Sequence, residues 1–203
     1  TGVQMTGWFK KEIKSVGDFK GLKMRIPGLA GKVDATLGVD VKLLPGGEIF
    51  PALERGVIDA AEFVGPYQDR RLGLQKAAKY YYTTGWHETA TVSELLVNKA
   101  AWEKLPKDLQ AILQYAAEAA SSANWWTAMD NYSRDLQDLM GKHKVNVIRT
   151  PKSIFVEQLK AWDILTKELS DEDPFFAKVV ASQKAWAKRV AYYMFVNEAD
   201  YKL

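Results

Sequence analysis

The sequence predicts an α/β fold in which a lobe with a mixed or mostly parallel sheet precedes a long lobe-spanning helix and C-terminal helices. Three observations lead to this prediction. Short strand-like and helical runs alternate over the first hundred residues, which is the pattern of βαβ units. No Gly or Pro occurs between Pro106 and Gly141, so one uninterrupted helix is expected there. Beyond residue 150 the apolar residues recur at helical spacing.

Turn residues delimit the elements of the first lobe. Pro27 and Gly28 stop the first strand, and Gly38 suits the left-handed position that follows a helix. Pro51 is expected in the first turn of the next helix, where proline is tolerated, and Gly56 lies just past its end. We therefore expect strands over residues 23–26, 39–44, 57–64 and 89–98, and helices over 32–37 and 48–55.

A long helix over residues 106–140 dominates the second half of the sequence. A helix of about 35 residues is ~50 Å long, which exceeds the width of one small lobe. We interpret it as a brace across two lobes, with Trp125 and Trp126 as packing residues in its middle. A strand over 145–149 and helices over 154–169 and 174–197 follow. The predicted domains are an α/β ligand-binding lobe over 1–105, and over 106–203 the long helix, one strand and C-terminal helices that pack on the other lobe.

Composition excludes several classes of protein. The 203 residues are 47% apolar and 26% charged, with a net charge of +3 and no long run of like charges, so no nucleic-acid partner is expected. The absence of cysteine excludes a disulfide framework and a cysteine nucleophile. No apolar run is long enough to predict a membrane-spanning helix. Because the chain starts at Thr1 without an initiator Met, we interpret it as a processed or partial product.

Arg25 is the first candidate binding residue, because it ends a predicted strand directly before Pro27 and Gly28. Ligands of open α/β sheets collect outside the carboxyl ends of the strands. A guanidinium there can bind a carboxylate through two parallel hydrogen bonds. The alternative from sequence alone is a surface arginine or a structural salt bridge.

Glu62 is the second candidate, because it stands in the otherwise apolar end of the predicted strand 57–64. A buried carboxylate must be paired, solvated or bound to a cation. Asp59 lies three residues earlier, on the opposite face of a strand, and therefore makes a poor acid–base partner. The simpler alternative is that Glu62 emerges into solvent where the strand ends.

Other catalytic and metal-binding motifs are missing from the sequence. His87 and Glu88 begin an H-E-x-x-H pattern, but Thr91 occupies the last position. The only other histidine, His143, lies near a predicted helix end, so a zinc site is not expected. The sequence also lacks a G-x-S-x-G elbow and a glycine-rich phosphate loop.

Four segments carry a resemblance to a known family: residues 7–13, 19–26, 44–56 and 58–67. They resemble solute-binding proteins of TRAP transporters, the DctP family. A further stretch, residues 80–88, narrows the resemblance to the branch that binds 2-oxo or 2-hydroxy monocarboxylates with a metal ion. The resemblance implies a periplasmic-binding-protein-like fold, in which two α/β lobes close on a ligand. It covers the C-terminal portion of such proteins, with the N-terminal lobe missing.

The resemblance also implies how the ligand is bound. Arg25 occupies the place of the arginine that pairs with the ligand carboxylate. Gln4, shortly before Gly-Trp-Phe, occupies the place of a glutamine that contacts both ligand and ion. Trp86 and Glu88 fall in the family's segment at the ligand, whereas His87 replaces a residue that is often aromatic.

A cation bridging ligand and protein, Na⁺ or Ca²⁺, is implied by the same resemblance. Its expected ligands are Gln4, Glu62, Glu88 and the backbone carbonyl of Phe63, which also lines the ligand. These are hard oxygen donors, which suit sodium or calcium and not zinc. Phe63 replaces a tryptophan that is frequent in the family, so an indole hydrogen bond is lost.

The function implied is that of a periplasmic, non-catalytic solute-binding subunit of a TRAP transporter, made from a precursor with a signal peptide. It would capture a small organic acid such as pyruvate or lactate and deliver it to the membrane subunits of the transporter. One alternative is an enzyme, a lyase or hydrolase that uses Glu62 and Glu88 on a small carboxylate. Another is a helical interaction module built on residues 106–203. The last aromatic helix could also pack on a second copy to form a homodimer.

Overall fold

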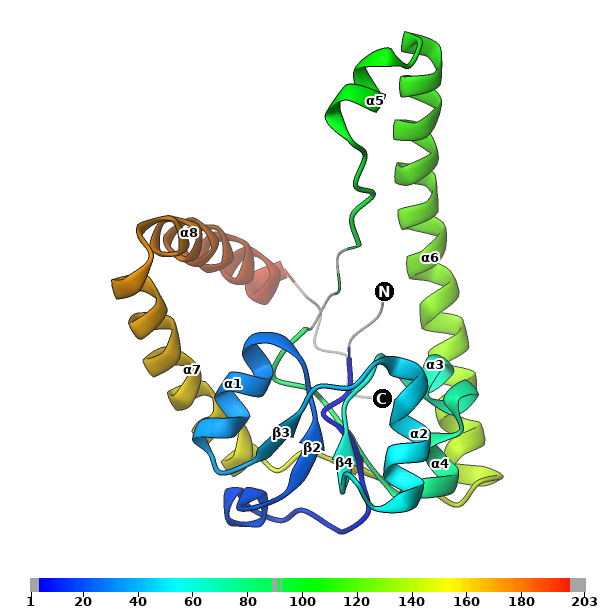
Figure 1. Ribbon diagram of the computed structural model, residues 1–203, viewed down its shortest axis with the longest axis vertical. Helices are drawn as coiled ribbons and strands as arrows, with labels where there is room; N and C mark the ends of the chain where they lie inside the picture. The colour runs from blue at the N-terminus through cyan, green and yellow to red at the C-terminus, as the bar shows by residue number, and fades with distance from the viewer. Residues whose placement is uncertain (1–3, 89–90, 92, 198–203) are drawn as a thin grey trace. The chain divides into compact units, whose positions relative to one another are not determined.

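The computed structural model describes residues 4–88, 91 and 93–197 (Figure 1). The chain forms two compact units, residues 1–158 and 159–203, and each is described separately. The first unit contains the sheet and most of the helices. The predicted domain boundary after residue 105 stays a prediction.

A mixed sheet forms the centre of the first unit, as the sequence predicts. Its strand order is β3-β2-β4-β1-β5-β6. β1 runs antiparallel to both of its neighbours, β4 and β5, whereas the other neighbouring strands pair in parallel. The strands are β1 (Gly7–Phe9), β2 (Lys23–Arg25), β3 (Asp40–Lys42), β4 (Ala60–Ala61), β5 (Tyr80–Thr83) and β6 (Asn146–Arg149).

Helices flank the sheet, and the longest of them, α6, lies against α3 (Figure 1). The 35 residues of α6 confirm the long helix expected from the sequence. The helices are η1 (Val16–Phe19), α1 (Gly28–Thr36), α2 (Gly46–Arg55), α3 (Pro66–Leu72), α4 (Leu74–Ala77), α5 (Lys99–Lys104), α6 (Lys107–Gly141), α7 (Lys152–Glu172) and α8 (Pro174–Asn197).

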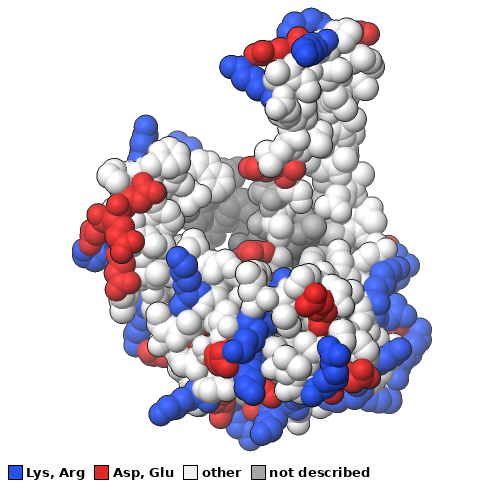
Figure 2. Space-filling model, viewed as in Figure 1, with Lys and Arg blue, Asp and Glu red and all other residues white. Residues whose placement is uncertain are grey.

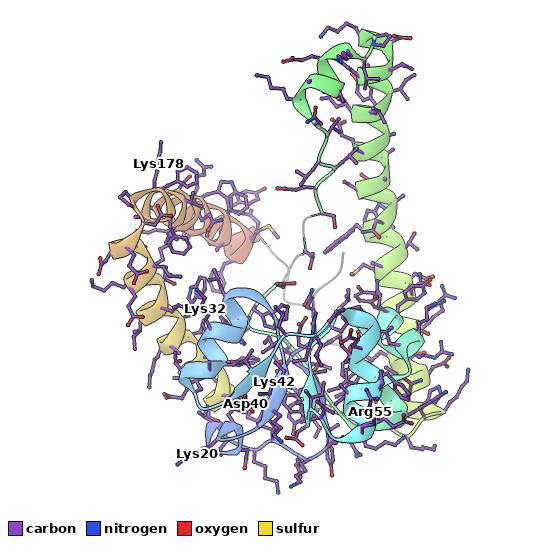
Figure 3. The ribbon with its side chains drawn as sticks, viewed as in Figure 1. Lys20, Lys32, Asp40, Lys42, Arg55 and Lys178 are labelled. Atoms are coloured by element: carbon purple, nitrogen blue, oxygen red, sulfur yellow. The ribbon has the colours of Figure 1, made fainter. Side chains whose placement is uncertain are left out.

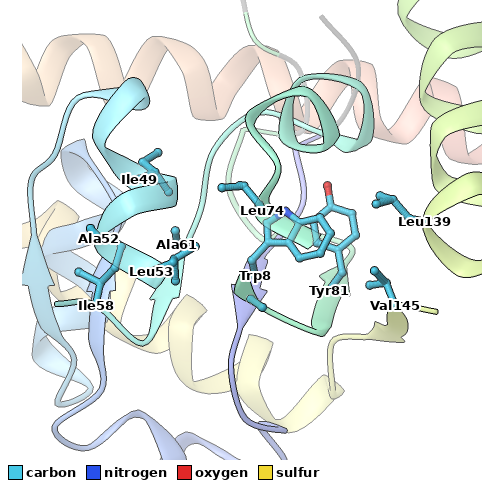
Figure 4. Packing of buried hydrophobic residues seen from close by; sticks show 11 residues of the cluster. Trp8, Ile49, Ala52, Leu53, Ile58, Ala61, Leu74, Tyr81, Leu139 and Val145 are labelled. Carbon is cyan, nitrogen blue, oxygen red and sulfur yellow. The ribbon is translucent and has the colours of Figure 1, made fainter. Parts of the chain in front are cut away.

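The two faces of the sheet carry two hydrophobic clusters, because neighbouring residues of a strand point to opposite faces. Trp8 of β1 and Tyr81 of β5 belong to one cluster, and their rings stack 4.1 Å apart (Figure 4). Phe9 and Tyr82, the next residue of each strand, belong to the other cluster. Burial of these aromatic side chains on both faces stabilises strands of only a few residues.

The predicted strand over 57–64 is wrong in its extent, since only Ala60 and Ala61 form β4. At its start, the amides of residues 57 and 58 still bond to the carbonyl of Ala52 in the turn that ends α2. At its end, the amides of residues 64 and 65 bond to the side chain of Asp69. Both ends are therefore held by partners outside the sheet.

The predicted strand over 89–98 is also wrong for the residues that are described. Residues 91 and 93–98 form no strand, and residues 89, 90 and 92 lie outside the described residues. Leu95 and Leu96 are 66% and 85% exposed, so the apolar run that predicted a strand is not covered. The sheet is completed instead by β5, a tyrosine run that the sequence reading did not assign to a strand.

Three expectations about the helices need correction. α1 begins at Gly28, four residues before the predicted start of the helix over 32–37. α2 begins at Gly46, two residues before the predicted start, which places Pro51 inside the helix and not in its first turn. Trp125 and Trp126 are 39% and 71% exposed, because no described element covers the middle of α6. The part of α6 that packs against α3 includes the buried residues Ala128, Tyr132 and Leu139.

The second unit consists of the end of α7 and the helix α8. The described residues of α8 include none that is buried. Within the described ranges, no helix is both long and apolar enough to cross a membrane. In the first unit, basic and acidic side chains are interspersed over the face in Figure 2, as the mixed charge pattern of the sequence indicates.

Candidate functional site

Arg25 and Glu62 come together at the carboxyl ends of two neighbouring parallel strands. Arg25 is the last residue of β2, and it pairs in register with Ala61, the last residue of β4. The amide of Glu62 then donates to the carbonyl of Arg25 at 2.9 Å, which extends the ladder by one residue. The topology therefore places both predicted site residues where α/β sheets bind their ligands.

The guanidinium of Arg25 is held by three hydrogen bonds. Nη1 donates to the backbone carbonyl of Glu62 at 2.7 Å and to its Oε2 at 3.2 Å. Nε donates to the carbonyl of Leu44 at 3.2 Å. Nη2 forms no hydrogen bond with another described residue. One terminal nitrogen of a well-fixed guanidinium thus remains for another acceptor.

The carboxyl of Glu62 is almost completely buried, with 3% of its side chain exposed. Burial raises the pKa of this carboxyl to about 8, although the Arg25 guanidinium acts to lower it. The carboxylates of Glu88 and Asp69 raise the pKa further. Arg25 alone therefore does not offset the cost of ionising Glu62 in this environment.

Gln4 lies beside the segment that carries Glu88. The amide of Gln4 donates to the carbonyl of Glu88 at 3.2 Å. A Cβ on Gly85 would come within 2.9 Å of the carbonyl oxygen of Gln4, so this close approach requires glycine. The Oε1 atom of Gln4 is buried and accepts no hydrogen bond from a described residue, which leaves this oxygen of the site in need of a donor or a cation.

Aromatic and imidazole side chains border these polar groups. The ring of Phe63 lies 5.8 Å from Cζ of Arg25, and Gly46 at the start of α2 leaves room for this ring. Trp86 and His87 have ring centroids 5.4 Å apart. Burial lowers the pKa of His87, and both of its ring nitrogens are buried with no hydrogen-bond partner among the residues that the structure describes.

The structure therefore relates the predicted site residues to one another in two sets. Direct contacts join Arg25, Glu62 and Phe63, and a backbone hydrogen bond joins Gln4 to Glu88. The influence of Glu88 on the pKa of Glu62 places the two sets within electrostatic reach. Among the described residues, no three His, Asp or Glu side chains form a cluster suited to a metal ion. The predicted cation set contains only two carboxylates, so this finding does not test it.

Asp69 is a residue near the site that the sequence reading missed. It is 1% exposed and accepts hydrogen bonds from Trp8, Tyr81 and two backbone amides. Its position in the first turn of α3 was the available signal, because Gly65 and Pro66 form a recognisable helix start. The carbonyl of Leu44, which accepts from Arg25, carried no signal in the sequence.

Comparison with known proteins gives one family. Residues 1–172 match the bacterial extracellular solute-binding proteins, family 7, called DctP. The chain is 46% identical over its whole length to the monocarboxylate 2-oxoacid-binding periplasmic protein of Nostoc sp., and it spans 55% of that relative.

Solved structures with the same architecture were obtained with ligands. A TRAP periplasmic solute-binding protein from Colwellia psychrerythraea, with bound calcium and pyruvate, is 43% identical with a TM-score of 0.91, and the match covers 97% of this chain and 60% of that one. A counterpart from Pseudoalteromonas atlantica, with sodium and pyruvate, is 40% identical at the same TM-score and coverage. A third, from Bordetella bronchiseptica, is a dimer with calcium and picolinate. It is 38% identical to this chain with a TM-score of 0.90, and the match covers 96% of this chain and 58% of that one.

Proposed function

Because the chain belongs to family 7 of the bacterial extracellular solute-binding proteins, we propose that it forms part of a periplasmic subunit that captures a small organic acid for a TRAP transporter. The ligand class is a 2-oxo or 2-hydroxy monocarboxylate such as pyruvate or lactate. The subunit binds and delivers this acid to the membrane subunits of the transporter without chemical change. The chain spans about half the length of its curated relative, so the activity of the whole protein belongs to this proposal.

The observation that carries the proposal is the environment of Arg25. Its guanidinium is anchored through Nε and Nη1, while Nη2 makes no hydrogen bond with a described residue. A ligand carboxylate can accept a hydrogen bond from Nη2 without any rearrangement of Arg25. A second parallel bond, from Nη1, requires that Arg25 release the carboxylate of Glu62. The ligand and Glu62 therefore compete for the same guanidinium.

The residues around Glu62 fit a hard cation. The buried Oε1 of Gln4 has no donor within the described part of the chain, and burial together with Glu88 disfavours the ionised form of Glu62. A cation held by Gln4, Glu62, Glu88 and the carbonyl of Phe63 would coordinate the buried oxygen of Gln4 and neutralise the carboxylate of Glu62. When bound, Na⁺ or Ca²⁺ supplies positive charge for the carboxylate and for the oxo or hydroxyl oxygen of the ligand. Solved relatives with calcium or sodium beside pyruvate support this choice.

Trp86, Glu88 and Phe63 complete the proposed ligand contacts. The Phe63 ring beside Arg25 offers an apolar surface of limited size, which suits the short methyl group of pyruvate or lactate. His87 brings to the same segment two ring nitrogens that no described residue hydrogen-bonds, where the family more often has an aromatic ring. The small apolar surface and the two centres of positive charge favour a short acid with an oxygen substituent beside its carboxylate.

Calorimetry of the purified chain with pyruvate and lactate, with and without calcium or sodium, tests this function. The proposal expects binding that requires a cation and recovery of the acid intact by mass spectrometry. Chemical turnover of the acid would instead favour the enzyme alternative, with Glu62 and Glu88 as its acid–base groups. Absence of binding in every combination would refute capture of this ligand class.

A homodimer through α8 is the second part of the proposal. None of the described residues of α8 is buried. Large aromatic side chains on a solvent-facing helix usually mark an interaction surface. A related solute-binding protein from Bordetella bronchiseptica was solved as a dimer, which supports a second copy as the occupant. The most exposed aromatic residues of α8 are Phe175, Trp186, Tyr192, Tyr193 and Phe195.

A further inference from the structure

We propose that Asp69 is a positioning residue of the candidate site, whose carboxylate holds the segment 62–65 so that Glu62 and Phe63 are presented to the cation. This inference rests on the proposed function only for the identity of the bound groups. The geometry that carries it belongs to the protein itself. Asp69 is not one of the residues predicted to bind the acid or the cation, and it acts through the backbone amides of Val64 and Gly65.

The carboxylate of Asp69 is buried and fully engaged. Oδ2 accepts from Nε1 of Trp8 at 2.8 Å and from the hydroxyl of Tyr81 at 2.9 Å. Oδ1 accepts from the amides of Val64 and Gly65 at 3.1 and 3.0 Å. Four donors for one carboxylate offset part of the cost of its burial, although burial still raises the pKa of Asp69.

The two oxygens of Asp69 serve different parts of the fold. Oδ2 is bound to the centre of the sheet, because Trp8 lies on β1, Tyr81 lies on the adjacent β5, and their rings stack. Oδ1 is bound to the segment that follows β4. Asp69 therefore ties an irregular segment to two paired strands of the sheet.

Glu62 and Phe63 lie between two fixed points of the backbone. On one side the amide of Glu62 donates to the carbonyl of Arg25. On the other side Asp69 holds Val64 and Gly65, and the ring of Tyr132 packs so tightly on Gly65 that a Cβ there would approach it to 2.7 Å. Binding groups are most effective when neighbouring residues fix them in advance.

A purely structural role for Asp69 is the competing explanation, since any lost buried hydrogen bond lowers stability. Two variants separate the explanations. Asp69→Ala removes both sets of hydrogen bonds. Tyr81→Phe removes one donor to Oδ2. It leaves in place the two hydrogen bonds that Oδ1 accepts from the amides of Val64 and Gly65. The two variants are compared at urea concentrations that give them equal free energies of unfolding. Any remaining difference then reports the effect on the segment 62–65.

Hydrogen exchange of the backbone amides, measured by NMR, is the direct test. In the wild type, the amides of Val64 and Gly65 should exchange as slowly as those of the central strands, although they lie outside any strand. In Asp69→Ala the amides of Val64 and Gly65 should exchange roughly tenfold faster than the loss of global stability explains. In Tyr81→Phe their exchange rates should change only as much as the global stability does. Calcium affinity by calorimetry should fall roughly tenfold in Asp69→Ala and stay within about twofold of wild type in Tyr81→Phe.

Two results would overturn the inference. One is rapid exchange of both amides in the wild type, which needs no variant and decides the matter even if Asp69→Ala does not fold. The other is equal local exchange and equal calcium affinity in Asp69→Ala and Tyr81→Phe. A wild type that binds neither cation nor acid would refute the proposed function alone, because the exchange measurements still decide the role of Asp69.

Discussion

Arg25 and Glu62 form two hydrogen bonds through a single nitrogen, with Nη1 of Arg25 at 2.7 Å from the backbone carbonyl and 3.2 Å from Oε2 of Glu62. The guanidinium that is proposed to bind the ligand is therefore also hydrogen-bonded to the carboxyl group that is proposed to bind the cation. Arg25 can bind the ligand through both terminal nitrogens only when a cation takes its place beside Glu62. Ligand and cation binding should consequently support each other.

The first prediction concerns this coupling. Calcium or sodium should raise the affinity for pyruvate, and pyruvate should raise the affinity for the cation by the same factor, because coupling free energies are reciprocal. Glu62→Gln should abolish the dependence on added cation. Calorimetric titrations in both orders measure the two factors. Cation-independent binding by the wild type would contradict the coupling and the proposed cation site.

The second prediction concerns the carboxylate anchor. Arg25→Ala should weaken pyruvate binding roughly tenfold or more, since a charge-assisted hydrogen bond contributes about 1.5–3 kcal/mol. Arg55→Ala is the matched control, because Arg55 lies at the end of α2 (Figure 3) and, among the described residues, its side chain donates only to the carbonyl of Pro51 in its own helix. Unchanged affinity in Arg25→Ala, measured by calorimetry, would remove Arg25 from the site.

The third prediction concerns pH and stability. Burial raises the pKa of Asp34 to about 6 from an ordinary value of 3.8, although Nε2 of Gln158 donates to its Oδ1 at 3.0 Å. The folded state thus keeps a proton that the unfolded state releases, and Asp34 destabilises the fold increasingly as the pH rises from about 4 to above 6. Asp34→Asn should be more stable than wild type by roughly 2–3 kcal/mol at pH 8 and about equal at pH 4.

Urea denaturation at the two pH values measures this difference. Asp40→Asn is the control for the change in net charge, because Asp40 is half-exposed and pairs with Lys42 on β3 at 2.8 Å (Figure 3). An equal gain of stability at both pH values would show that hydrogen bonding, and not ionisation of Asp34, governs the effect.

The fourth prediction concerns the close approach of Gly65 to Tyr132. A Cβ on Gly65 would lie 2.7 and 2.8 Å from two ring carbons of Tyr132, so Gly65→Ala should lower the free energy of unfolding by about 1–3 kcal/mol. Gly47→Ala is the control, because no atom lies within 4 Å of the added Cβ. Thermal unfolding followed by circular dichroism compares the two. Equal stability of both variants would mean that Tyr132 moves aside without cost.

The fifth prediction concerns the proposed dimer. Trp186→Glu should shift the chain from dimer to monomer in light scattering at micromolar concentration, because it places a charge in the proposed apolar interface. Trp126→Glu changes a tryptophan of α6 that is similarly exposed, 71% against 59%, and should leave the dimer intact. A wild type with the mass of one chain would contradict dimerisation through α8.

Much of the fold could be predicted because its signals are local. The long helix follows from an unbroken stretch without Gly or Pro, and α2 ends at Gly56, which has the left-handed conformation that its position after a helix indicates. Arg25 could be placed at a strand end from the turn that follows it. These features depend on residues a few positions apart, so the sequence alone contains the information.

The strands β1 and β5 could not be predicted, because their stability comes from partners distant in the sequence. β1 and β5 contain three and four residues, too few for an alternating pattern, and they pair across about seventy residues of sequence. The predicted strand over 89–98 failed for the opposite reason. An apolar run satisfied the local pattern, but its described residues have no neighbouring strand.

The sequence by itself determined the mixed α/β class, the long helix and the candidate residues Arg25 and Glu62. Only the tertiary structure decided that one nitrogen of Arg25 serves both the carbonyl and the carboxylate of Glu62. It likewise decided that Asp69 joins the sheet to the segment after β4. The physical reason is that hydrogen bonds form between atoms within about 3 Å, and the folding of distant strands into one sheet sets those distances.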